Sequence, residues 1–162
     1  MFRVLFLCTG NSARSILGEA ILNDLGRGRF TALSAGSQPA GAVNPLALSV
    51  LREHGHPVDR LHSKSWQAFA GHDAPEVDLV ITVCDRAARQ ACPVWPGHPL
   101  IVHWGIPDPV AATGTDAEKH AVFEDAYQTL RTRIEGLLEL AMDMDDEAAL
   151  RHKLDEIGQA TG

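Results

Sequence analysis

Three shortages in the sequence each exclude a class of protein. Only three cysteines occur among the 162 residues, and they form no CxxC pair and have no tight histidine cluster beside them. A structural zinc site is therefore not expected, because such sites need closely spaced cysteine or histidine ligands. No apolar run approaches the roughly 18 residues that a membrane-spanning helix requires. The sequence thus predicts neither a metal site nor association with a membrane.

Basic residues are also scarce relative to acidic ones. Lysine and arginine number 14 against 21 aspartates and glutamates, which gives a formal net charge of -7. Nucleic-acid-binding proteins usually carry a basic face, so no nucleic-acid partner is expected. The apolar N-terminal run is too short for a signal-peptide core and has no small-residue cleavage site after it. We therefore expect a cytoplasmic protein whose cysteines serve catalysis, redox cycling or burial rather than a structural disulfide.

Apolar runs alternate with helical patterns along the whole chain. Short runs of aliphatic residues predict four strands, at 3–7, 31–36, 77–84 and 99–104. Helical spacing and capping signals predict helices at 13–25, 44–55, within 63–69, at 115–138 and at 145–157. Strands that alternate with helices imply a single-domain α/β fold, with a four-stranded parallel sheet and helices on both faces. We expect residues 1–142 to form this domain and residues 143–162 to add an amphipathic helix that packs on it or extends it.

Chemically interesting residues follow three of the predicted strands. Cys8 and Cys84 each end a strand, and Asp108 comes a few residues after the fourth. In parallel α/β sheets the active site lies at the carboxyl ends of the strands. These three side chains are therefore expected on one edge of the sheet.

The stretch CTGNSARS turns from the first strand into the first helix, and this geometry favours an anion site. Gly10 and Asn11 can take backbone angles that bulkier residues resist. Successive N–H groups can then face inward, and the helix N-terminus adds the positive end of its dipole. A tetrahedral oxyanion would fit this cradle, whose expected binding residues are Thr9, Gly10, Asn11, Ser12, Ala13 and Arg14.

The same electrostatic field predicts a reactive cysteine at the base of the cradle. Arg14 supplies a fork for two oxygens of the anion. Its charge and the helix dipole favour a thiolate, so we expect Cys8 to have a lowered pKa and to be the nucleophile. Ser15 can donate a hydrogen bond to the sulfur. In the simpler alternative, Cys8 is only the last buried residue of a strand and Asp108 only a turn residue before Pro109.

Four segments carry a resemblance to a known family. The Cys-x5-Arg-Ser pattern near the N-terminus, together with Asp108-Pro109, resembles the low-molecular-weight protein tyrosine phosphatases, which use an Asp-Pro general acid late in the chain. With the additional segments SAG, ITVCDRAARQACPVWPG and VHWGIPDP, the sequence closely resembles the thioredoxin-linked arsenate reductases of that superfamily. The resemblance spans roughly residues 3–140.

The resemblance implies a thiol relay that acts on arsenate, a structural analogue of phosphate. Cys8 would form a thiol–arsenate adduct, Cys84 would attack the Cys8 sulfur and release arsenite, and Cys92 would attack Cys84 and carry the disulfide to the surface. No bound cofactor is implied. The electrons would come from an external thiol donor, either thioredoxin or glutaredoxin with glutathione, and phosphate or sulfate would compete with arsenate.

Two other functions remain open on the sequence alone. The first is a phosphatase for phosphotyrosine or small aryl phosphates, in which Cys84 and Cys92 are regulatory or buried thiols. The second is a non-catalytic anion or redox sensor. The intact set of Cys8, Arg14 and Asp108 speaks against the sensor.

The chain departs from its resembled relatives at two positions near the cradle. They often carry a cysteine where this chain has Ala13. Some also bind potassium through an acidic residue in a segment that matches LHSKSW, which here contains Lys64 and no acid. Lys64 is either solvated or takes the place of the cation near Asn11, Glu19 and Ser34.

The spacing of the two later cysteines implies a conformational change. If residues 84–92 are helical in the reduced protein, eight positions separate their Cα atoms by about 12 Å. A disulfide tolerates no more than about 7 Å. Formation of a Cys84–Cys92 disulfide must therefore unwind or loop out the intervening residues.

Overall fold

The computed structural model describes residues 1–70, 73–85, 87, 99–142 and 144–160. Cys92 lies outside this range, as does most of the 84–92 segment that is predicted to unwind. Within the described residues, no helix is both long enough and apolar enough to cross a membrane.

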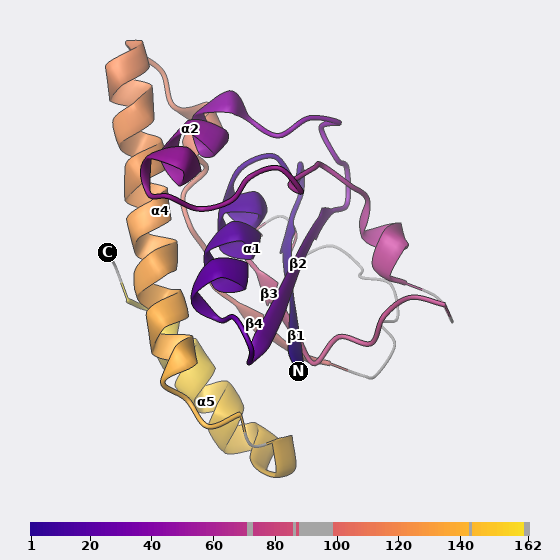
Figure 1. Cartoon of the computed structure of the whole chain (residues 1–162). Helices are drawn as coiled ribbons and strands as arrows, with labels where there is room; N and C mark the ends of the chain where they lie inside the picture. The colour runs from indigo at the N-terminus through magenta and orange to yellow at the C-terminus, as the bar shows by residue number, and fades with distance from the viewer. Residues whose placement is uncertain (71–72, 86, 88–98, 143, 161–162) are drawn as a thin grey trace.

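Four parallel strands form one sheet in the order β2-β1-β3-β4 (Figure 1). They are β1 (Phe2–Cys8), β2 (Phe30–Gly36), β3 (Leu79–Thr82) and β4 (Leu100–His103). The sheet and all four strand positions confirm the sequence prediction. The third and fourth strands are shorter than predicted, because their paired residues run only from Leu79 to Thr82 and from Leu100 to His103.

Within the part of the chain that the structure describes, four α-helices and three 3-10 helices accompany the sheet. They are α1 (Arg14–Leu25), α2 (Pro45–Glu53), η1 (Trp66–Phe69), η2 (Pro109–Ala111), α4 (Asp116–Leu138), η3 (Met144–Asp146) and α5 (Glu147–Ile157). The predicted caps are present. The Asn44 side chain accepts from Leu46 N–H at the start of α2, and Thr115 and Glu118 form the capping box of α4.

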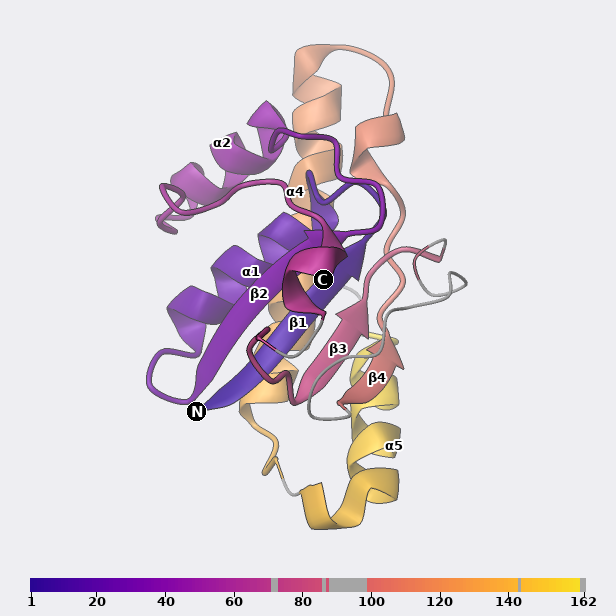
Figure 2. The same cartoon turned by 90° about the vertical axis from the view of Figure 1, so that its right-hand side faces the viewer.

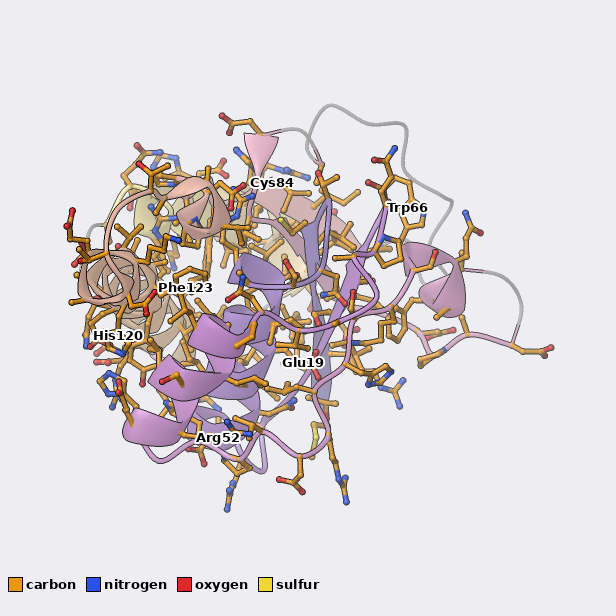
Figure 3. All side chains as sticks on the ribbon, turned by 90° about the horizontal axis from the view of Figure 1, so that it is seen from above. Glu19, Arg52, Trp66, Cys84, His120 and Phe123 are labelled. Atoms are coloured by element: carbon orange, nitrogen blue, oxygen red, sulfur yellow. The ribbon has the colours of Figure 1, made fainter. Side chains whose placement is uncertain are left out.

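The two faces of the sheet are covered unequally. The larger core joins alternate β1 side chains such as Val4 and Phe6 to α1, α2, α4 and α5. On the other face, Leu5 and Leu7 pack with Phe69 and Trp66 of η1. Figure 2 shows η1 in front of the sheet with α1 and α4 behind it, and in Figure 3 Trp66 lies across the sheet from Phe123 of α4. Helices therefore lie on both faces, as predicted, and the carboxyl ends of the strands stay open.

Candidate active site

A cavity of about 500 Å³ opens at the carboxyl ends of β1 and β3. Figure 3 looks onto this edge and labels Cys84 there. The cavity is lined by Cys8, Thr9, Gly10, Ser12, Ala13, Arg14, Cys84, Asp85, Ile106, Pro107, Asp108 and Val110. It therefore unites residues that are up to 102 positions apart in the sequence (8 against 110) on the predicted edge.

The loop from residue 9 to residue 13 is held so that its N–H groups face the cavity. The carbonyls of Thr9, Gly10 and Ser12 accept hydrogen bonds from the N–H groups of residues 38, 40 and 44. In a trans peptide the next N–H points opposite to the carbonyl. The N–H groups of residues 10, 11 and 13 therefore point away from the 38–44 segment, toward the space where an anion would bind.

Asn11 keeps this loop in shape from inside the protein. It is fully buried and has a φ of 45°, in the left-handed region where asparagine is more tolerated than most residues. Its amide donates to Ser15 Oγ (2.8 Å) and Ser34 Oγ (3.0 Å), and its Oδ1 accepts from Lys64 N–H (2.8 Å). These three bonds satisfy the buried side chain and offset the cost of its backbone conformation.

Lys64 extends this buried network and is not solvated. Its Nζ lies 3.4 Å from Glu19 Oε1, 3.3 Å from Ser34 Oγ and 2.8 Å from the His62 carbonyl oxygen. Only 14% of the Lys64 side chain and 11% of the Glu19 side chain are exposed. Of the two alternatives for Lys64, the structure shows the one in which its ammonium group stands beside Glu19 and Ser34.

Arg14 and Asp108 face each other across the cavity mouth. Arg14 NH1 donates to the Ile106 carbonyl (2.8 Å), and its NH2 is 3.7 Å from Asp108 Oδ1. The Asp108 side chain is 46% exposed and its Oδ1 accepts from the Val110 N–H (3.0 Å). One guanidinium thus connects the cradle to a carboxyl group that is open to a bound molecule.

Cys8 and Cys84 form a hydrogen-bonded pair of buried thiols. Their exposed fractions are 5% and 4%. The hydrogen bond with Cys8, assisted by Thr9 Oγ1 (3.5 Å) and by the Ala87 N–H (3.4 Å), lowers the pKa of Cys84 to about 5. The same bond and burial raise the pKa of Cys8, and the Arg14 charge lowers it by less. The interaction therefore raises the pKa of Cys8 and lowers that of Cys84, so it favours a thiolate at Cys84 over one at Cys8.

This charge distribution corrects the expectation of a lowered pKa for Cys8. Arg14 acts in the expected direction, but the neighbouring thiol outweighs it while the two sulfurs are in contact. Ser15 also differs from expectation. Its oxygen accepts from Asn11, and no hydrogen bond from Ser15 to the Cys8 sulfur is found among the described residues.

Comparison with known protein families shows which family has an anion-binding loop and fold of this kind. The model of the low molecular weight phosphotyrosine protein phosphatases matches residues 3–153. The chain belongs to this family. Within the family it is 37% identical over 136 residues to an arsenate reductase of Bacillus licheniformis, an alignment that covers 84% of this chain and 94% of the relative. It is 34% identical over 136 residues to an arsenate reductase of Bacillus subtilis, with the same coverage.

Solved structures of both kinds of family member are similar to this one. An arsenate reductase in its oxidized state has a TM-score of 0.69 and 25% identity, and the match covers 85% of this chain and 97% of the other. A low molecular weight protein tyrosine phosphatase from T. tengcongensis has the same TM-score and identity, with coverages of 86% and 99%. The shared fold alone therefore does not separate the two activities.

Residues that the sequence analysis did not single out complete this family member's site. Asp85 lines the cavity directly after Cys84, and its Oδ1 lies 2.9 Å from His103 Nε2. His103 Nδ1 is in turn 2.7 Å from Thr82 Oγ1. The position of Asp85 next to a candidate cysteine was the available signal, whereas its pairing with a histidine of β4 depends on the strand register.

Proposed function

We propose that this protein is an arsenate reductase that works through a Cys8 thiol–arsenate adduct and a Cys8, Cys84, Cys92 relay. The observation that carries the proposal is the second thiol, Cys84, hydrogen-bonded to the nucleophile inside the oxyanion cavity. Phosphate ester hydrolysis needs only one cysteine at that place, whereas reduction of arsenic needs a second thiol to take up the oxidised sulfur. The names of the relatives from the two Bacillus species support the same reaction.

The first step joins the Cys8 sulfur to arsenic. Arsenate lies in the cradle of residues 9–13, with its oxygens on backbone N–H groups and on Arg14. As the sulfur attacks, the Cys8 proton passes to the Cys84 thiolate, to which it is already hydrogen-bonded. One hydroxyl group of the protonated arsenate leaves with its bonding electrons and takes a proton from Asp108, so it departs as water. Cys8 is then bound to an arsenic that is still pentavalent.

The second step reduces the arsenic. Cys84 passes its proton to the Asp108 carboxylate, which lines the same cavity, and the Cys84 thiolate attacks the Cys8 sulfur. The sulfur–arsenic bond breaks, and its electron pair stays on arsenic, which becomes trivalent and leaves as arsenite. A Cys8–Cys84 disulfide remains, so two electrons have moved from the two thiols to arsenic. Cys8 and Cys84 are well placed for this step, because both line the same cavity.

The third step regenerates Cys8. The Cys92 thiolate attacks the Cys84 sulfur, Cys8 leaves as a thiolate, and an external dithiol donor of the thioredoxin or glutaredoxin type reduces the resulting Cys84–Cys92 disulfide. We place the protein in the cytoplasm, where such donors keep thiols reduced. Phosphate and sulfate, which have the same tetrahedral shape, would compete for the cradle. No resident cofactor takes part in this scheme.

The test is arsenate-dependent NADPH oxidation, run with a thioredoxin system and separately with a glutaredoxin–glutathione system. Turnover with at least one of them is expected, and Cys8→Ser should abolish it because the proposal assigns the attack on arsenic to Cys8, whereas Cys84, the other thiol that lines the cavity, acts only on the adduct. A variant that still released arsenite at the parent rate would contradict the assignment of Cys8. If no arsenite formed with either donor system, the reductase proposal would be contradicted.

Hydrolysis of small aryl phosphates is a second candidate activity. It is favoured by the complete set of Cys8, Arg14 and Asp108 in one cavity. An arsenate reductase of similar structure, 25% identical with a TM-score of 0.62, is described in a phosphate binding state. The comparison of the two activities in a single Cys84→Ser variant, described below, separates the relay from the hydrolytic machinery.

A further inference from the structure

The chain that leads to Asp108 is held from two sides by two arginines. Arg14 NH1 donates to the Ile106 carbonyl (2.8 Å), and Arg133 NH1 donates to the preceding Gly105 carbonyl (3.3 Å). The Ile106 N–H donates to the Val83 carbonyl (3.1 Å). From there, Asp108 stands between Pro107 and Pro109, whose rings restrict the backbone. The hydrogen bonds that fix the backbone of residues 105 and 106 therefore largely determine the position of the Asp108 carboxyl group.

Arg133 also connects this segment to the chain after α5, and as a buried cation it does so through a backbone carbonyl and not through a carboxylate. It is 5% exposed, and among the described residues no carboxylate lies within ion-pair distance of it. Its Nε donates instead to the carbonyl of Ala160 (2.9 Å), close after α5. Burial lowers the pKa of Arg133, which reflects the cost of keeping this charge away from water with only neutral partners.

Helix α5 also contacts Trp104, the residue that precedes Gly105. Trp104 is fully buried, and its indole Nε1 donates to the Leu154 carbonyl (2.9 Å). A Cβ added to Gly158 would lie 2.7 Å from Trp104 Cδ1, so the backbone after α5 lies directly against the indole ring. Figure 2 shows α5 beside β4, whose end leads into this segment.

We infer that α5 and residues 158–160 position Asp108, through Arg133 on the Gly105 carbonyl and through the indole of Trp104. Arg133 and Trp104 are then positioning residues that act at a distance on the step in which Asp108 donates its proton. The inference rests on the proposed role of Asp108 as the general acid. Misplacement of a catalytic group by about 1 Å can cost up to about 100-fold in rate, so small changes at this contact should be measurable.

The test uses two glycines of the same helical layer. Gly158→Ala inserts a methyl group against Trp104, whereas Gly136→Ala in α4 adds one at 3.4 Å from Ile157, an ordinary contact distance. Phenyl phosphate releases phenolate, a poor leaving group, so its hydrolysis needs a proton from the general acid. 2,4-Dinitrophenyl phosphate releases a good leaving group, so its hydrolysis does not need that proton. We expect Gly158→Ala to slow the first reaction about tenfold in kcat and to leave KM and the second reaction within about twofold. Gly136→Ala should leave both unchanged.

A readout without activity keeps the inference separate from the proposed function. Hydrogen exchange at the Ile106 amide should accelerate in Gly158→Ala, while exchange at the Val83 amide, which bonds to Leu7, should not. Trp104→Phe, which removes the bond to Leu154, should show the same pattern if Gly158→Ala does not fold. Unchanged Ile106 exchange and unchanged phenyl phosphate hydrolysis would overturn the inference. If Asp108→Asn slowed both esters equally, the general-acid role would be wrong, whereas the exchange result would still decide whether α5 holds the loop.

Discussion

The opposite pKa shifts of Cys8 and Cys84 lead to a prediction that can be measured without any substrate. In a Cys92→Ser background only these two cysteines titrate. Replacement of Cys8 by alanine removes the hydrogen bond that is the largest cause of the low pKa of Cys84. Burial, which acts in the opposite direction, remains. The pKa of Cys84 should therefore rise.

The size of the rise follows from the strength of such a bond. With a pKa of about 5, Cys84 is about 99% thiolate at pH 7, whereas at its ordinary value of 9.0 it would be about 1%. A hydrogen bond to a charged group contributes about 1.5 to 3 kcal/mol, which corresponds to roughly one to two pH units. Cys8→Ala should therefore move the midpoint of Cys84 from about 5 toward 6 or 7, and Thr9 and Ala87 should keep it below 9.0.

The assay is a pH titration of the ultraviolet absorbance of the thiolate, which also reports on buried sulfur. Cys84→Ala in the same background is the matched control, and it should shift in the opposite direction. There Cys8 loses the neighbour that most raises its pKa and keeps the Arg14 charge, so its pKa should fall. A midpoint for Cys84 that stays near 5, or that falls, in Cys8→Ala would show that the hydrogen bond with Cys8 does not lower the pKa of Cys84.

Further predictions concern turnover. Cys8→Ser should abolish arsenate reduction and aryl phosphate hydrolysis together, as measured by arsenite release and phenol release. Cys84→Ser should stop arsenate turnover but largely preserve aryl phosphate hydrolysis; the reverse pattern would refute the relay. Arg14→Lys loses the planar fork toward the anion and should lower the kcat/KM of both reactions by about 100-fold, and an unchanged value would remove Arg14 from the site. Arsenate without donor should give a Cys84–Cys92 disulfide by mass spectrometry, with faster amide exchange in residues 85–91; unchanged exchange in the verified disulfide form would contradict the predicted unwinding.

Local sequence signals were sufficient for most of the fold. The four strands were visible as short aliphatic runs, and the caps at Asn44 and Thr115 marked the starts of two helices. A parallel sheet follows from their alternation, because strands joined through helices cannot pair as hairpins. The edge that carries Cys8, Cys84 and Asp108 could then be predicted from the rule that such sheets bind ligands at their carboxyl ends.

What the sequence could not supply depends on distances between elements. The sequence located the Cys8 loop between β1 and α1, but the charge state of Cys8 depends on a sulfur 76 positions away (84 against 8). A local argument counts only Arg14 and the helix dipole, and so it predicts the wrong direction for the pKa. The burial of Lys64 is of the same kind, since its partners Glu19 and Ser34 come from α1 and β2. Such pairings become visible only once the register of the strands is known.

The arrangement of the cradle explains how one fold can serve both hydrolysis and reduction. Apart from the hydrogen bond between Thr9 Oγ1 and the Cys84 sulfur, the contacts that hold the anion loop do not involve Cys84: Asn11 is held by Ser15, Ser34 and the Lys64 amide, and Gly36 lets the Thr9 carbonyl approach where a Cβ would come within 2.4 Å. Because these contacts leave Cys84 out, the cradle can keep its shape while Cys84 changes its bonding partner. Anion binding and the first attack then belong to the rigid loop, which a phosphatase also needs. In the proposed relay, the redox step depends on Cys84, which follows β3, because a thiol beside the nucleophile can take up the oxidised sulfur while two electrons pass to arsenic.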